Sequence, residues 1–179
     1  ADGLHYTRVA PGQAFIPHGS VAEHGYDSHV CFASAFPVKL ASETRVYYTG
    51  GDGPHYSPAT GPLHRNTSFA LATLRPDGFV ALRAKPPSDS GSALTVPLRV
   101  SGRRLLVTAD AAPAGSVGVR VRSALSGAAI LTTCTTIAGR NVTDHLLDGC
   151  DLRGLVRQEV ILELHVMGGA ALFMVGFHA

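Results

Sequence analysis

Residues 47–55 carry the side chains best suited to bind a polar ligand, in the order YYTGGDGPH. An aromatic strand here enters a glycine-rich turn that holds an acid and an imidazole. Aromatic rings offer a stacking surface, and carboxylate and imidazole groups bond hydroxyls. Since side chains alternate along a strand, only one of Tyr47 and Tyr48 can face a ligand. The candidate ligand-binding residues are Tyr48, Asp52, His55 and Asp27; in the alternative interpretation, Asp52 only caps its own turn.

A second cluster combines histidines with an acid. It comprises His18, His24, Asp27 and His29. Neutral imidazole and carboxylate are zinc ligands, so the three histidines are weak candidates for a metal site. Their spacing matches no established ligand pattern, and no predicted strand or helix holds them together. We therefore predict no metal and no cofactor, and interpret the histidines as solvated or structural.

Composition narrows the classes of function. The chain has 179 residues, of which 45% are hydrophobic and 16% charged, with a net charge of +2. A chain of this length and hydrophobic content can bury one sizeable core, and its composition is not that of a disordered protein. The only basic doublet, Arg103-Arg104, opens an apolar run, and no basic face with interleaved aromatics predicts nucleic-acid binding. No apolar stretch approaches the length needed to span a bilayer, so we expect no membrane partner.

The cysteine pattern bears on the compartment. Cys31, Cys134 and Cys150 are the three cysteines, and a Cys134–Cys150 pair would leave Cys31 free. Two glycosylation sequons begin at Asn66 and Asn141, and they are a weak indication of secretion. The count favours three reduced thiols in a cytoplasmic protein over a secreted one, and leaves the compartment unassigned. The run around Cys31 is apolar, which favours a buried, inert thiol.

The hydrophobic pattern predicts strands from end to end, and the turns between them are rich in glycine and proline. The expected strands are 28–38, 43–49, 68–74, 79–84, 93–100, 104–109, 116–123, 128–133, 159–166 and 171–177. Pro76-Asp77-Gly78 predicts a hairpin that joins two of them, and Gly168-Gly169 predicts another at the C-terminus. Helical signals are confined to 144–149 and to a single turn at 151–155.

These elements predict an all-β protein, an antiparallel, jelly-roll-like β-sandwich preceded by a loop-rich, blade-like β segment. We place the loop-rich segment at residues 1–65 and the sandwich at 66–179, and expect the two to form one compact unit. No internal repeat of fixed period occurs, so the chain does not encode a complete propeller.

Several motifs, taken in order, resemble the last propeller blade and C-terminal β-sandwich of proteins related to glycoside hydrolase families 32 and 43. The blade-like motifs are Tyr26-Asp27-Ser28, Tyr47-Tyr48-Thr49-Gly50 and Asp52-Gly53-Pro54-His55. The sandwich-like motifs are residues 69–82, 104–111, 115–117, 151–155, 160–164 and 172–173. The resemblance covers most of the chain beyond about residue 26, and it implies common ancestry with these proteins.

The resemblance does not imply that this chain has the glycoside hydrolase activity of the family. In such enzymes the catalytic carboxylates lie on earlier blades, and none of the thirteen acids here matches a catalytic motif. Glycoside hydrolysis needs two carboxylates that flank one bond. We therefore expect no catalytic residues and favour a non-catalytic β-sandwich module, while the question of an enzyme stays open. The alternatives are a weak carbohydrate-binding domain, with carbohydrate as partner, and a hydrolase fragment or an enzyme with an unrecognised histidine-containing site. The oligomeric state is left unassigned.

Overall fold

The computed structural model describes residues 10–56, 61, 64–111, 113–131 and 134–179. It confirms the all-β prediction, with several antiparallel sheets. The chain forms two compact units, Ala1–Thr73 and Leu74–Ala179. The division lies eight residues later than the boundary expected at 65/66, because the strand at residues 67–74 pairs within the first unit.

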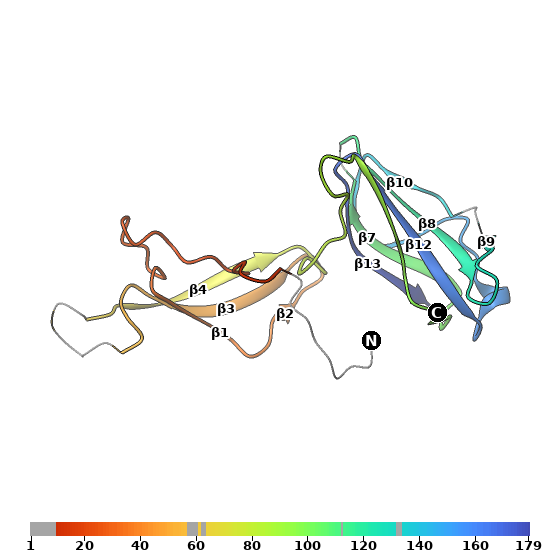
Figure 1. Cartoon of the computed structure of the whole chain (residues 1–179). Coiled ribbons are helices and arrows are strands. Elements are labelled where there is room, and N and C mark those ends of the chain that lie inside the picture. Colours follow the sequence, from red (N-terminus) through yellow and green to blue (C-terminus); the bar gives the residue numbers. More distant parts are fainter. Residues whose placement is uncertain (1–9, 57–60, 62–63, 112, 132–133) are drawn as a thin grey trace. The chain divides into compact units, whose positions relative to one another are not determined.

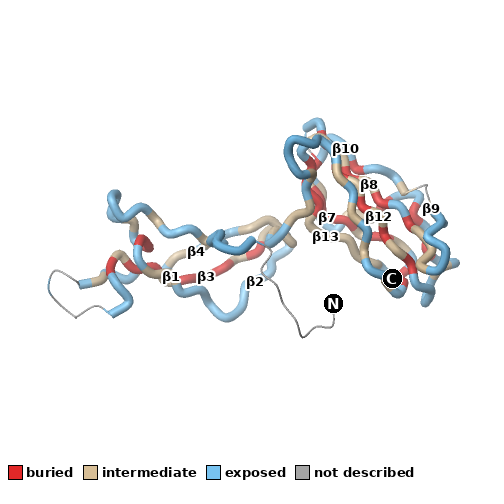
Figure 2. Tube along the Cα trace, in the orientation of Figure 1, coloured by how far each residue is buried: buried red, intermediate tan, exposed pale blue. Residues whose placement is uncertain are grey.

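The N-terminal unit contains a four-stranded sheet built around one central strand (Figure 1). Its strands are β1 (Val30–Ala33), β2 (Val38–Lys39), β3 (Thr44–Gly51) and β4 (Thr67–Leu74). β1, β2 and β4 all pair with β3. β3 alternates strictly in burial along most of its length, as a strand with one covered face should. Figure 2 shows β3 as the buried run of this unit.

The strand expected at 28–38 is interrupted. β1 pairs with the end of β3, and β2 pairs with its beginning. Between them the Ser34 N–H still donates to the Tyr47 carbonyl at 2.8 Å, after which the chain turns away before Pro37. Proline has no N–H to contribute to a ladder, so it breaks the strand where the hydrophobic pattern continues.

The C-terminal unit is a sandwich of a six-stranded and a three-stranded sheet (Figure 1). The larger sheet contains β5 (Ser90–Leu94), β6 (Leu98–Arg99), β8 (Ser116–Ser123), β9 (Ala129–Leu131), β10 (Ile137–Ala138) and β12 (Glu159–Met167). The smaller sheet contains β11 (Asn141–Leu146), β7 (Arg104–Asp110) and β13 (Ala171–His178), in that order. Pro97 again splits an expected strand, 93–100, into two. Residues 132 and 133 of the strand expected at 128–133 lie outside the described residues.

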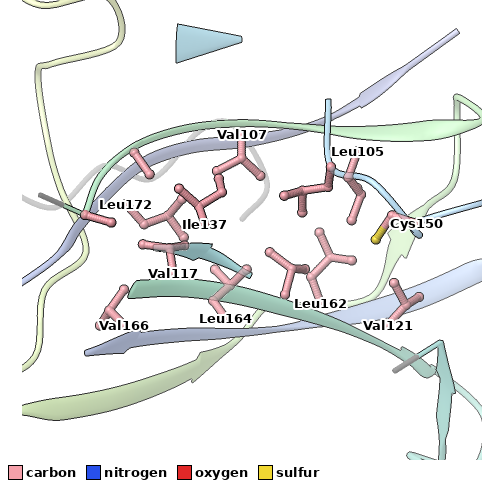
Figure 3. Packing of buried hydrophobic residues seen from close by; sticks show 14 of the residues in the cluster. Leu105, Val107, Val117, Val121, Ile137, Cys150, Leu162, Leu164, Val166 and Leu172 are labelled. Atoms are coloured by element: carbon pink, nitrogen blue, oxygen red, sulfur yellow. The ribbon is translucent and has the colours of Figure 1, made fainter. Parts of the chain in front are cut away.

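The core of this unit lies between the two sheets. Leu105 and Val107 of β7 face Val117 of β8 and Leu162 and Leu164 of β12 (Figure 3). All five are at most 9% exposed. Alternate residues of each strand supply the core, as expected for two stacked sheets, so burial of these side chains provides the main stabilisation of the unit.

The predicted strand at 79–84 and its hairpin are wrong. The turn itself forms, with the Gly78 N–H donating to the Arg75 carbonyl at 3.0 Å. Asp77, not Gly78, adopts the positive φ, 57°. Only a single bridge, Leu82 to Leu172, follows it. β4 belongs to the sheet of the N-terminal unit, whereas Leu82 bridges to β13, so the segments on either side of the turn do not pair with each other.

The predicted helix at 144–149 is also wrong, because this segment enters β11. Asp144 has a φ of 48°, and the pairing of β11 with β7 shifts register there. The Asp144 N–H donates to the Thr108 hydroxyl at 3.1 Å, which fixes this irregularity. The short turn expected at 151–155 is confirmed as the 3-10 helix η1 (Arg153–Leu155).

The predicted C-terminal hairpin is wrong in its pairing. Gly168 and Gly169 do form a tight turn, with φ values of 60° and 75° that suit glycine. β12 then belongs to the larger sheet and β13 to the smaller one. The turn therefore carries the chain from one layer of the sandwich to the other, where the sequence pattern suggested adjacent strands.

The prediction of three reduced thiols is wrong for two of them. Cys134 and Cys150 form a disulfide, with their Cα atoms 4.5 Å apart. Cys31 is free and half-buried in β1. Burial and the nearby Asp27 carboxylate raise the pKa of the Cys31 thiol, which agrees with an unreactive side chain.

No helix in the described ranges is both long and apolar enough to cross a bilayer.

Candidate functional site

The two faces of β3 have different surroundings. Thr44, Val46 and Tyr48 lie on the buried face, whereas Arg45 and Tyr47 lie on the other face. The alternation of a strand decides which tyrosine can meet a ligand. Tyr47 lies on the face opposite to Tyr48, which is only 6% exposed and lies in the interior of the unit.

Tyr48 belongs to a buried hydrogen-bond network. Its hydroxyl donates to Oδ2 of Asp27 at 3.1 Å and lies 2.7 Å from the hydroxyl of Tyr26. Oδ1 of Asp27 accepts from the Gly19 N–H at 3.0 Å. The hydrogen bond to Tyr26, burial and the hydrogen bond to Asp27 all raise the pKa of Tyr48. Tyr48 and Asp27 thus hold the segment before β1 onto the sheet.

This network requires a glycine on β3. A Cβ at Gly50 would meet the Cβ of Asp27 at 2.5 Å, closer than two carbons can approach. Gly50 therefore allows residue 27 to lie directly on the strand. The Tyr-Asp and Tyr-Tyr-x-Gly motifs singled out in the sequence meet here in a structural role.

Asp52 is held by a residue from the next strand. Its Oδ1 accepts the Asn66 N–H at 2.7 Å, and its Oδ2 accepts the Asn66 amide group at 2.8 Å. The Asp52 N–H donates back to the Asn66 carbonyl at 3.3 Å. These bonds from the Asn66 side chain and backbone lower the pKa of Asp52. The pair, called the Asp52–Asn66 clasp below, ties the end of β3 to the start of β4.

His55, the fourth predicted site residue, is exposed and stands in a row of rings. Its ring centroid lies 5.5 Å from that of Phe32 and 5.3 Å from that of Tyr56, with edge contacts in both pairs. The Arg65 guanidinium donates to the His55 carbonyl at 3.1 Å, which helps to position the backbone. Of the four predicted residues, His55 alone presents its side chain to solvent among other aromatic groups.

The structure also shows aromatic side chains near the candidate site that the sequence interpretation missed. Tyr47 lies 6.3 Å from Phe69 of β4, centroid to centroid. Phe32 of β1 is directly opposite Thr49, which alternation places on the same side as Tyr47. Together these residues form what we call the aromatic face: Phe32, Tyr47, His55, Tyr56 and Phe69. The alternation of Phe69 and Leu71 in β4 was the available signal, but only pairing with β3 shows which side these residues share.

The histidine cluster does not assemble into a metal site. Nδ1 of His18 lies 3.3 Å from the Ser28 carbonyl oxygen, and Nδ1 of His29 lies 3.1 Å from the Ser28 hydroxyl. His24 occupies a turn with a φ of 51°. Within the residues that the structure describes, no group of three or more His, Cys, Asp or Glu side chains could hold a metal ion.

The arrangement suits binding more than bond cleavage. Both acids of the candidate site already accept two hydrogen bonds each from protein groups, and Asp27 is buried. The exposed side chains of the aromatic face are rings with polar edges at His55 and at the tyrosine hydroxyls. Such a surface can stack against an apolar ring face and bond a few hydroxyls.

No protein-family model matches this chain, and neither a curated protein nor a solved structure matches it significantly.

Proposed function

We propose that the chain is a non-catalytic β module whose N-terminal sheet binds carbohydrate weakly through the aromatic face. The observation that carries this proposal is the set of exposed rings on one side of β1, β3 and β4. Phe69 is 79% and Tyr56 91% exposed, although both are large apolar side chains. Apolar surface gathered on one sheet face, beside polar ring edges, is typical of an interaction site.

Carbohydrate is the partner whose chemistry fits this surface. A sugar ring combines an apolar C–H face with peripheral hydroxyls, which matches rings flanked by imidazole and phenol groups. The resemblance to glycosidase-related proteins favours the same partner. The chain contains no tryptophan, so the aromatic surface on which a sugar ring could stack is small. A dissociation constant of about 1 mM is therefore expected.

The test is a titration of the protein with soluble oligosaccharides chosen from a glycan array, followed by NMR. Phe69→Ala should weaken binding at least fivefold and remove the shifts of neighbouring amides. Phe36→Ala is the matched control, because Phe36 is 81% exposed in the loop between β1 and β2 and makes no ring contact within the described residues. Unchanged affinity in Phe69→Ala, or the same loss in both variants, would contradict the proposal.

A second arm tests the non-catalytic part. We expect no turnover of aryl glycosides by the purified protein, because both acids of the candidate site already accept hydrogen bonds from Tyr48, Gly19 and Asn66. Turnover that disappears on substitution of one acid would show that the chain is a hydrolase.

A further inference from the structure

A basic pocket lies at one end of the C-terminal sandwich. The aromatic face belongs to the other unit of the chain. The basic pocket has a volume of about 410 Å³. Three arginines line it: Arg103 just before β7, Arg104 at the first position of β7, and Arg153 of η1. Leu147 and Cys150, both 2% exposed, supply an apolar floor. Residues fifty positions apart in the sequence thus converge on one cavity.

The backbone of this pocket is rigidly held. The Arg103 N–H donates to the His178 carbonyl at 2.6 Å, and the Leu152 N–H donates to the Arg103 carbonyl at 2.8 Å. The disulfide between Cys150 and Cys134 anchors the floor. Because these bonds fix the main chain before any ligand arrives, a ligand pays little ordering cost to bind.

The three guanidinium groups differ in how many hydrogen bonds and ion pairs they form with other residues. Arg153 is clamped by Asp151, with Nε at 2.9 Å and Nη2 at 2.6 Å from Oδ2, which leaves Nη1 outside the pair. Arg104 has only a loose contact, 3.5 Å, with Asp148. The Arg103 side chain has no hydrogen-bond or ion-pair partner within the described part of the chain. Donors therefore remain for an incoming anion.

The negative charges around the pocket are few. Asp151 is the acidic side chain in its wall, and both of its oxygens accept from Arg153. That contact lowers the pKa of Asp151 to about 2, so the pair stays ionised at neutral pH. Ala179 completes the wall, and no ion pair joins it to the three arginines in the described ranges. Asp151 and, beside Arg104, Asp148 are thus the acidic side chains near the three guanidinium groups.

We propose that this pocket binds a small acidic sugar, that is, a monosaccharide that carries a carboxylate or a sulfate. Arginine forks bond such oxyanions in a planar, two-point geometry. The volume exceeds what a free anion needs and lies within the range of small-ligand sites. The apolar floor suits the C–H face of a sugar ring. The proposal is independent of the aromatic face.

The experiment compares three ligands at constant ionic strength: glucuronate, glucose and sodium sulfate. NMR titration should give a dissociation constant of about 1 mM for glucuronate, with shifts at Arg103, Arg104 and Gly149. Glucose and sulfate should each bind at least fivefold more weakly. Arg103→Gln and Arg104→Gln should each weaken glucuronate binding about tenfold, whereas Arg120→Gln, on an exposed position of β8, should leave it unchanged.

Two controls separate this proposal from the aromatic-face proposal and from misfolding of the variants. Phe69→Ala should retain glucuronate binding, because it alters the other unit, so failure here and failure of the aromatic-face proposal are separate results. Unchanged amide spectra away from the pocket show that each arginine variant is folded. Equal affinity for sulfate and glucuronate would reduce the pocket to an inorganic-anion site, and equal affinity for glucose would remove the role of the arginines. Either result, or unaltered binding in both arginine variants, overturns the proposal.

Discussion

At the scale of single residues, Tyr48 shows how a side chain that looks like a ligand platform can be structural. Its hydroxyl bonds the buried Asp27 carboxylate and lies within hydrogen-bond distance of the hydroxyl of Tyr26, which is partly exposed. The neighbouring Tyr47 has nearly the same sequence context but lies on the aromatic face with Phe69. One position along a strand reverses the side, and therefore the role, of a residue.

Removal of the Tyr48 hydroxyl should destabilise the N-terminal unit without affecting ligand binding. In Tyr48→Phe, Asp27 loses a buried donor, which costs about 1–2 kcal/mol. Tyr47→Phe is the matched control and should change the free energy of unfolding far less. Chemical denaturation followed by tyrosine fluorescence measures both. Equal destabilisation in the two variants would show that the hydroxyl of Tyr48 contributes no more to stability than that of Tyr47.

Acid should weaken the N-terminal unit through the Asp52–Asn66 clasp. The folded state lowers the pKa of Asp52, so the clasp contributes fully above the unfolded value, about 3.9, and is lost as the pH falls through the lower folded value. Stability should thus decline below about pH 4, and Asp52→Asn should be less stable at pH 7 yet less sensitive to acid. Melting curves from pH 7 to pH 2 test this. Loss of carbohydrate binding in a folded Asp52→Asn protein would instead make Asp52 a ligand contact.

At the scale of elements, prolines and paired neighbours decide where strands begin and end. Two long apolar runs, 28–38 and 93–100, each become two strands because a proline interrupts the ladder. The run at 79–84 has the composition of a strand but forms only the single bridge from Leu82 to Leu172. The segment 144–149 looked helical, yet β7 offers an edge on which residues 141–146 pair.

The disulfide should stabilise the segment that contains β10 and β11. Cys134 and Cys150 are 16 residues apart, and closure of a loop of that length restricts the unfolded chain by about 3 kcal/mol. Cys134→Ser with Cys150→Ser should lower the free energy of unfolding by about that amount, while Cys31→Ser should have a small effect. A thiol count on the denatured, unreduced protein should find one free thiol. Three free thiols would contradict the pairing.

At the scale of the whole molecule, the two units differ in what holds them together. The C-terminal unit has a continuous apolar core between two sheets, to which β7, β8 and β12 contribute most. The N-terminal unit is a single sheet whose covered face relies on Val46, Tyr48 and the polar contacts of Asp27. Stability therefore resides chiefly in residues 74–179.

The fragment 74–179 should fold by itself. Its core residues, its disulfide and its turn at Arg75–Gly78 all lie within it. Its melting temperature should lie within about 10 °C of that of the corresponding transition in the full chain. Calorimetry and amide dispersion in NMR spectra provide the comparison. An unfolded fragment would show that the N-terminal residues are needed to complete the core.

The sequence by itself determined the all-β class, most of the strands, the turn at η1 and the positions of the turns at residues 75–78 and 168–169. These follow from local alternation and from the backbone preferences of glycine and proline, which act over a few residues. It also singled out Asp27 and Tyr48, which the structure joins by a hydrogen bond, but it did not predict that both are buried.

Only the tertiary structure decided what those residues do. Whether Tyr47 or Tyr48 is buried depends on which face of β3 the segment before β1 covers. Whether Asp52 is free depends on Asn66, which reaches it from another strand. The hairpin at Gly168-Gly169 and the convergence of Arg103 with Arg153 likewise depend on which strands pair. Strand pairing joins segments that are far apart in the sequence. The local hydrophobic pattern does not show which of these segments will pair.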